Sequence, residues 1–233
     1  AFAGPDPATA RRNLRLRIAT ILLGVALIAW QSRDRLLSGV GTALVVDDPL
    51  APVEVIVASI AAARADILEV ARLYHEGIAP RVVLARWQKE PLDDEMRRLD
   101  VPWLPITDLA VAMLERSGVP SNAIQVLAGP IDGLNTEIVT VAEFAHQEKP
   151  TSLLFVTARS HTRRARWLLE RLLPEGTTLL VRSARSDLFR ADAWWHSRSS
   201  SREVTMEYLR WANTFGLRDF WRKTPPSVPE SAE

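Results

Sequence analysis

The stretch LLFVTARSHTRRARWLLERLL, residues 153–173, contains a strand, a turn and a helix in succession. Its apolar beginning is typical of a strand that is buried on both faces of a parallel sheet. After a polar turn, apolar residues return at the spacing of one helix face: Ala165, Leu168, Leu169 and Leu172. The stretch also holds one histidine and five arginines, which indicates either a site for an anionic ligand or a solvated basic helix face.

Strands and helices of the same kind alternate along most of the chain. Helical periodicity recurs at residues 138–145, and Gly77 and Gly118 are expected to end two of the helices. This alternation predicts an α/β fold, a Rossmann-like three-layer domain with a mostly parallel sheet, in which ligands bind beyond the carboxyl ends of the strands. Apolar runs predict strands at residues 53–59, 81–85, 124–128, 152–158 and 178–183, with a candidate edge strand at 43–46.

The N-terminal region predicts a membrane anchor. Residues 18–30 are uncharged and apolar, and extending this run to residues 14–35, with Arg15 and Arg17 snorkelling, gives the roughly 20 residues that a span needs. The preceding arginines indicate a cytoplasmic N-terminus, with Trp30 at the far interface. We therefore expect a single-pass protein of the bacterial inner membrane that contacts the bilayer through residues 14–35 and has its domain in the periplasm. A signal peptide has the same layout, and a buried core helix is the alternative.

These patterns divide the chain into three parts. Residues 1–37 form an N-terminal tail and the single transmembrane anchor, residues 38–218 the α/β domain, and residues 219–233 a Pro-rich C-terminal tail. Twenty-nine basic and 28 acidic residues give a net charge of +1, so no global field attracts nucleic acid. The chain has no cysteine and no His-His-carboxylate spacing, and we expect neither a metal nor a cofactor. Its eight tryptophans favour interfaces.

Two polar clusters mark candidate site residues. After the strand ending at residue 158, Ser160 is a candidate N-cap, and His161 and Arg164 should share the first turn of the following helix. Free backbone N–H groups at such a helix start bind anions. In the second cluster, Asn135 or Thr136 is expected to cap the helix that follows.

These elements together resemble the YdcF-like family of α/β domains over roughly residues 53–215. The resemblance rests on four segments: NTE at 135–137, VTARSHTRRA at 156–165, ARLYHEGIAP at 71–80 and SREVTMEYLRW at 201–211. It implies a residual anion site made of Arg64, Asn135, Thr136, His161, Arg164 and Glu207. Arg64 and Glu207 are either ligand groups or a buried structural pair.

The chain departs from the family where glycine is expected. The family's first strand ends in a Gly-rich turn and its second in Ser-Gly-Gly, whereas this chain has ASIAAAR at 58–64 and ARWQ at 85–88. Glycine lets backbone amides approach a phosphate, so Ile60 or Trp87 is expected to fill part of the cleft. This predicts a degenerate site and favours a chain without enzymatic activity.

Two functional hypotheses follow. The first is a non-catalytic accessory subunit of a larger integral membrane complex, respiratory or photosynthetic, in which replacing His161 and Arg164 by alanine has at most a modest effect on stability. The alternative is an active envelope protein that binds or processes a phosphate-bearing, nucleotide-like or lipid-linked cell-wall ligand. There Arg64, His161 and Arg164 would bind the anionic group, Asn135 would orient it, and Glu207 would act as acid or base. An open cleft that reaches His161 favours the alternative.

Overall fold

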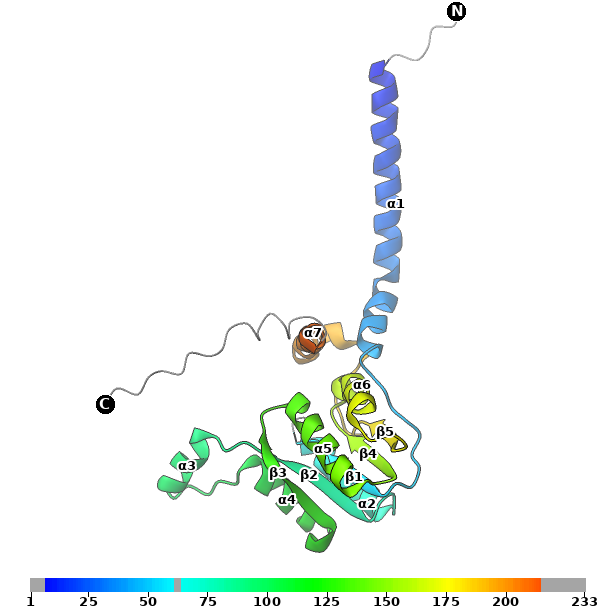
Figure 1. Cartoon of the computed structure of the whole chain (residues 1–233). Coiled ribbons are helices and arrows are strands. Elements are labelled where there is room, and N and C mark those ends of the chain that lie inside the picture. Colours follow the sequence, from blue (N-terminus) through cyan, green and yellow to red (C-terminus); the bar gives the residue numbers. More distant parts are fainter. Residues whose placement is uncertain (1–6, 61–63, 215–233) are drawn as a thin grey trace, which may run out of the picture.

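The computed structural model describes residues 7–60 and 64–214, with a five-stranded sheet at the centre of the domain (Figure 1). The strands run in the order β3-β2-β1-β4-β5, and all neighbours are parallel. The predicted α/β class with a parallel sheet is therefore confirmed. The strands are β1 Val55–Ala58, β2 Arg81–Trp87, β3 Ile124–Ile131, β4 Ser152–Val156 and β5 Thr178–Arg182.

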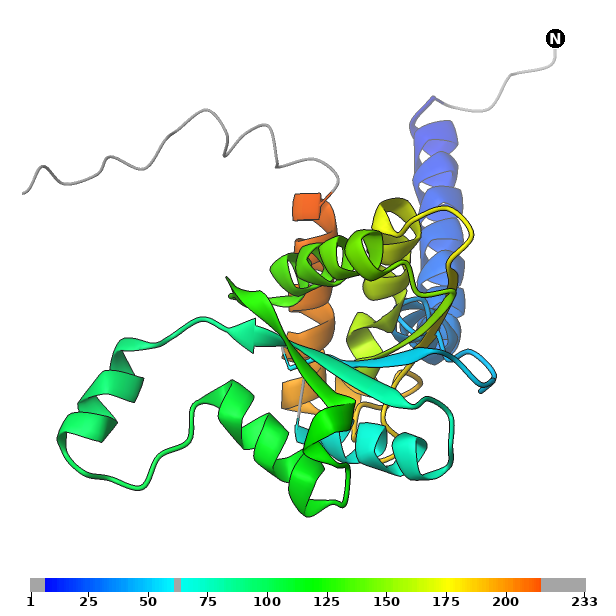
Figure 2. The same ribbon diagram turned by 60° about the horizontal axis from the view of Figure 1, so that its bottom comes forward.

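Helices cover both faces of this sheet, as Figure 2 shows. Alternate residues of β1 point to opposite sides, because successive side chains of a strand do so. Ile56 joins a core with α2 and α4, and Val57 joins a second core with α5 and α6. The layers are thus helix, sheet and helix. The helices are α1 Pro7–Thr42, α2 Arg64–His75, α3 Pro91–Arg98, α4 Ile106–Arg116, α5 Leu134–Glu148, α6 Thr162–Leu172 and α7 Arg198–Ala212, with 3₁₀ turns η1 Ser121–Ala123, η2 Arg159–His161 and η3 Trp194–His196.

Glycine ends two helices as predicted. Gly77 follows α2 with φ +74°, and Gly118 follows α4 with φ +91°. A side chain is strained in this left-handed region, so glycine is the residue that lets the chain turn back toward the sheet.

The predicted edge strand at residues 43–46 is wrong. This segment is a turn after α1 followed by irregular chain. Its backbone groups bond to the start of α6 instead of to β5: the Val46 N–H donates to Thr162 Oγ1 at 2.8 Å, and Arg163 donates to the Val45 carbonyl at 3.1 Å. Side chains of α6 thus form hydrogen bonds with the backbone groups of residues 43–46 that would otherwise have bonded to a neighbouring strand.

The helix α1 stands away from the domain in Figure 1 and leaves large apolar side chains exposed. Leu22 and Leu23 are 62 % and 72 % exposed. Among the described residues no single helix is long and apolar enough to cross a bilayer, but two parts of α1, Leu16–Val25 and Trp30–Thr42, pass that test together as a pair bent by 44°. The helix also continues to Thr42, beyond the expected end of the anchor near residue 37.

The end of α1 is fixed to the domain. Trp194 Nε1 donates to the Leu37 carbonyl at 2.7 Å, and the Tyr208 hydroxyl donates to the Val40 carbonyl at 2.7 Å. Gly41 lies against Ala191 and Trp194 so closely that a Cβ at this position would come within 2.5 Å of the Trp194 ring. The α1 helix therefore joins the domain through η3 and α7.

Candidate functional site

The sheet has its topological switch point between β1 and β4. The chain goes from β1 to β2 and β3 on one side, and then crosses to β4 and β5 on the other. Ligands of doubly wound folds bind at this point, outside the carboxyl ends of the strands. Ser59 and Ile60 follow β1 here, and the turn η2 follows β4. The sequence therefore placed its candidate residues at the correct edge of the sheet.

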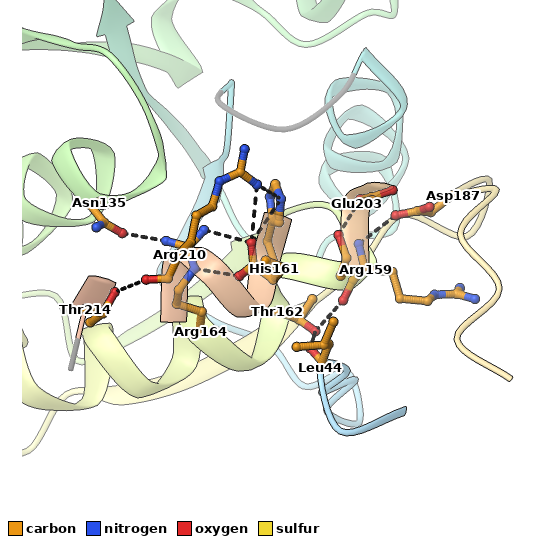
Figure 3. Close-up of polar contacts among 12 residues, drawn as sticks. Leu44, Asn135, Arg159, His161, Thr162, Arg164, Asp187, Glu203, Arg210 and Thr214 are labelled. Carbon is orange, nitrogen blue, oxygen red and sulfur yellow. Dashed lines mark hydrogen bonds and ion pairs between the residues drawn. The ribbon is translucent and has the colours of Figure 1, made fainter. Parts of the chain in front are cut away.

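A buried ion pair forms the centre of the site (Figure 3). Arg164, on the first turns of α6, is 2 % exposed, and Glu207 of α7 is fully buried. Arg164 Nε donates to Glu207 Oε1 at 2.5 Å, and Nη2 donates to Oε2 at 3.1 Å. Arg164 Nη1 also donates to Asn135 Oδ1 of α5 at 2.5 Å. One guanidinium thus joins three helices in the two-point geometry that arginine and carboxylate prefer.

This arrangement shows that Glu207 is part of a buried structural pair, and it changes the stability effect expected when His161 and Arg164 are replaced by alanine. The buried partner of Glu207 is Arg164, and both carboxylate oxygens are bound to it. Glu207 is therefore in no position to serve as acid or base toward a ligand. Removing Arg164 would leave the carboxylate buried without its main counter-charge, which costs several kcal/mol, so the modest effect expected for the alanine pair is replaced by a large one. Arg64 begins α2, and its side chain lies outside the described residues.

His161 sits beside this pair as a neutral group. Its Nε2 lies 3.6 Å from Glu207 Oε2 and 3.4 Å from Arg210 Nη1. Burial lowers the pKa of His161 to about 4; Glu207 opposes this shift, and the two arginines add to it. The imidazole is consequently uncharged near neutral pH and contributes no positive charge to an anion site. Its buried Nδ1 has no hydrogen-bond partner among the described residues.

The capping predictions are partly confirmed. The first residue of α5 is Leu134, so Thr136 is the third, and its hydroxyl accepts the backbone N–H groups of Asp132 at 3.1 Å and Gly133 at 3.2 Å. Asn135 points to Arg164 instead (Figure 3). Ser160 is no N-cap, because its buried hydroxyl donates to Glu203 of α7. Of the three candidate capping side chains, Asn135 and Ser160 thus bond to residues of other helices, and only Thr136 bonds locally.

Of the remaining arginines of residues 153–173, Arg163 and Arg171 are exposed. Arg159 and Arg166 are partly buried and contact Ser183 and Asp48. Arg163 Nε donates to the Ala43 carbonyl at 3.0 Å, and the Arg171 guanidinium stacks 3.7 Å above the Trp167 ring. The concentration of basic residues thus combines one buried ion pair with an exposed face that holds neighbouring segments.

Two carboxylates of the resembling segments that were not among the candidate site residues, Glu137 and Glu203, shape the site. Glu137 is fully buried; its Oε2 accepts the Ser59 hydroxyl at 2.6 Å and its Oε1 accepts the Ile60 N–H at 2.8 Å. It holds the turn after β1, where the family resemblance implied a Gly-rich phosphate loop. Glu203 lines the other side of His161, and burial raises its pKa. Glu137 belongs to the NTE segment, but a carboxylate in the first turn of a helix is common, so the sequence did not predict its tertiary contacts.

A cavity of about 340 Å³ opens at this edge. Trp87 forms one wall, as predicted, whereas Ile60 packs into the core on the α2 side. Arg210, missed in the sequence, also lines the cavity and is about half exposed; its spacing of three residues from Glu207 on α7 was the available signal. A second cavity of about 710 Å³ lies on the other side of His161. The first is lined by Trp87, Asp132, Gly133, Leu134, Asn135, His161, Arg164 and Arg210.

The charges of the smaller cavity nearly cancel. Arg164 is neutralised by Glu207, and exposed Asp132 opposes Arg210. Within the described ranges no group of three or more His, Cys, Asp or Glu residues is placed to hold a metal ion. The geometry thus offers room for a small polar ligand, with Arg210 as the cation in contact with it.

Comparison with known proteins adds no relative: no protein-family model, curated protein or solved structure matches the chain. The resemblance to the YdcF-like family stays a prediction from the four segments that carry it.

Proposed function

We propose that the chain is a membrane-anchored protein whose α/β domain is a non-catalytic accessory subunit of a larger integral membrane complex. The N-terminus is cytoplasmic in this proposal and the domain periplasmic. Energy-converting complexes, respiratory or photosynthetic, are the candidate partners. Membership of the YdcF-like family, with a degenerate site, is part of the same proposal.

The observation that carries the proposal is that the polar cluster holds helices together. Arg164 ties α7 to α6 and α5 through Glu207 and Asn135. The same helix α7 holds the end of α1 through Tyr208. The residues that would bind a ligand in the resembled family therefore connect the anchor helix to the sheet, which supports a structural role.

The exposed face of α1 supports the membrane part. Its apolar side chains have no cover among the described residues, and burying such surface is favourable by about 25 cal/mol per Å². A bilayer or the helices of a partner would provide that cover. The two parts of α1 reach the length and hydropathy of a span only together, so the proposed span crosses the 44° bend. The last turns of α1, from Leu37 on, then meet the domain.

Purification from the native membrane tests the accessory role. The chain, extracted in mild detergent and analysed by native mass spectrometry, should run with stoichiometric integral membrane proteins. A monomer without partners would refute the proposal. The orientation is tested with Asn122→Cys, an exposed position in a chain without cysteine. A membrane-impermeant maleimide should label it from the periplasmic side; labelling only after the inner membrane is opened would contradict the orientation.

A second candidate function rests on one observation, the open cavity that reaches His161. Its volume of about 340 Å³ lies at the lower end of the range for ligand sites. In this function the domain binds a small phosphate-bearing ligand through Arg210.

Arg210→Ala separates the two functions, because its side chain is about half exposed and contributes little to stability. With pyrophosphate and nucleoside diphosphates as probes in calorimetry, the second function requires binding that this variant loses. The accessory function requires that assembly with the membrane partner is unchanged in the same variant.

A further inference from the structure

Residues 88–105 form an arm that leaves the sheet after β2 and returns to α4 (Figure 2). Asp93 holds the arm together: its Oδ1 accepts Trp103 Nε1 at 2.7 Å and its Oδ2 accepts the Glu90 N–H at 2.9 Å. Trp87 Nε1 donates to Glu90 Oε1 at 3.1 Å. Both indole N–H groups are therefore satisfied inside the arm and its base.

A cavity of about 600 Å³, here called the arm groove, lies between this arm, the end of β2 and α4. Trp103 and Ile106 remain 43 % and 40 % exposed beside it. Exposed aromatic and aliphatic side chains around one groove mark an interaction site. Its apolar walls are Trp87, Leu92, Trp103, Pro105, Ile106 and Pro130.

The sequence supplies a segment with matching chemistry. Residues 224–233 read TPPSVPESAE and contain Pro226-Ser-Val-Pro229, a pair of prolines three residues apart. Segments of this spacing adopt the polyproline II helix at low entropic cost and dock in grooves lined by aromatic rings. Glu230 follows the last of these prolines, and no basic residue lies in 224–233.

The charges around the arm groove fit an acidic segment at one point. Lys89 and Arg97 are each paired with Asp94. Arg86 lines the groove, is exposed, and has no ion-pair partner among the described residues. Arg86 is thus the cation left to meet Glu230.

The path of the chain brings this segment within reach. The described chain ends at Thr214, one helical turn beyond Arg210. Arg210 lines the smaller cavity, and Trp87 forms a wall of both that cavity and the arm groove. Residues 215–223 span up to about 30 Å when extended. This length is enough to pass the Trp87 side chain, which forms a wall of both cavities.

We propose that the arm groove is a binding site for a proline-rich peptide and that residues 224–233 of the same chain occupy it. Pro226 and Pro229 pack against the rings of Trp87 and Trp103, and Glu230 pairs with Arg86. This proposal does not depend on the accessory function or on the smaller cavity.

The first test uses the full chain in detergent and a variant that ends after Lys223. Hydrogen exchange should become faster in residues 86–106 of the shortened chain, while α5 and α6 keep their protection. A labelled peptide of residues 222–233 should bind the shortened chain saturably and bind the full chain at least about tenfold more weakly, because the tethered segment competes. No saturable binding to the shortened chain overturns the proposal.

The second test locates the site. Replacing Pro226 and Pro229 by alanine in the peptide should weaken binding at least about fivefold, as loss of interface anchors does. Trp103→Ala in the protein should weaken binding by a similar factor. Because Trp103→Ala could also disrupt the arm, Arg86→Glu serves as a second variant of the groove. Arg86→Glu should weaken binding about threefold, and a peptide with Glu230→Arg should restore it. Unchanged affinity in Arg86→Glu and in the proline variants overturns the site.

Two further outcomes separate other occupants. Protection of residues 86–106 that rises with protein concentration would overturn the intramolecular contact and indicate a second copy of the chain. Equal peptide affinity of the full and shortened chains would also overturn it and indicate a proline-rich partner protein.

Discussion

Arg164 of α6 and Glu207 of α7 form a two-point ion pair with N–O distances of 2.5 and 3.1 Å. Both residues are almost completely buried. They lie 43 positions apart in the sequence. The pair joins the helices on the sheet to α7, which holds α1, so its strength sets how firmly α1 is attached to the domain.

Arg164→Ala should lower the free energy of unfolding by about 3–5 kcal/mol, because Glu207 then stays buried without its main counter-charge. Replacing both residues, Arg164→Met with Glu207→Leu, should be less destabilising, since no unpaired charge remains buried. Urea unfolding measures both. Arg116→Ala, an exposed arginine of α4, is the control and should change stability by less than about 0.5 kcal/mol. Equal effects of Arg164→Ala and the control would contradict the structural role.

Stability should fall on acidification because of His161. Its pKa is lowered from 6.5 to about 4 in the folded chain. The unfolded chain therefore binds a proton below pH 6.5 that the folded chain refuses until about pH 4, so stability is lost as the pH falls through this window. The full loss from this residue is roughly 3 kcal/mol.

His161→Gln should remove this contribution. Glu203, whose pKa is raised by burial, acts in the opposite direction in an overlapping range, so the difference between the parent chain and His161→Gln is the quantity to measure. Urea unfolding at intervals between pH 4 and 7 provides it. Parallel stability curves for the two proteins would show that His161 titrates normally.

Gly41→Ala should weaken the attachment of α1. The added Cβ would meet the Ala191 carbonyl and come within 2.5 Å of the Trp194 ring, and such overpacking typically costs about 1–3 kcal/mol. Gly39→Ala is the matched control, because a Cβ there meets nothing within 4 Å; it should stabilise the helix by about 0.5–1 kcal/mol. Limited proteolysis at residues 43–50 should speed up in Gly41→Ala alone. The same proteolysis rate in both variants would argue against a fixed joint.

Thr136→Ala should destabilise the start of α5 by about 1 kcal/mol, the usual effect of losing a capping side chain. The Thr136 hydroxyl bonds two backbone N–H groups, whereas that of Thr140, in the next turn, only donates to the Thr136 carbonyl at 3.1 Å. Thr140→Ala should therefore have the smaller effect in thermal unfolding. A larger effect of Thr140→Ala would mean that Thr136 does not close the helix.

The sequence by itself determined the strands, most helices and the edge of the sheet where polar residues gather. Apolar runs and helical spacing involve residues within a few positions of one another, so local pattern was enough for β1 to β5, and for the turns at Gly77 and Gly118.

The partners of the polar residues depended on the tertiary structure. Thr162 takes the N–H of Val46 from 116 positions away, which removed the expected edge strand. Glu207 likewise pairs with Arg164, which lies 43 positions away. A buried charge is costly unless a counter-charge lies within about 3 Å. Which counter-charge lies there depends on the packing of helices that are distant in the chain, so local sequence does not reveal it.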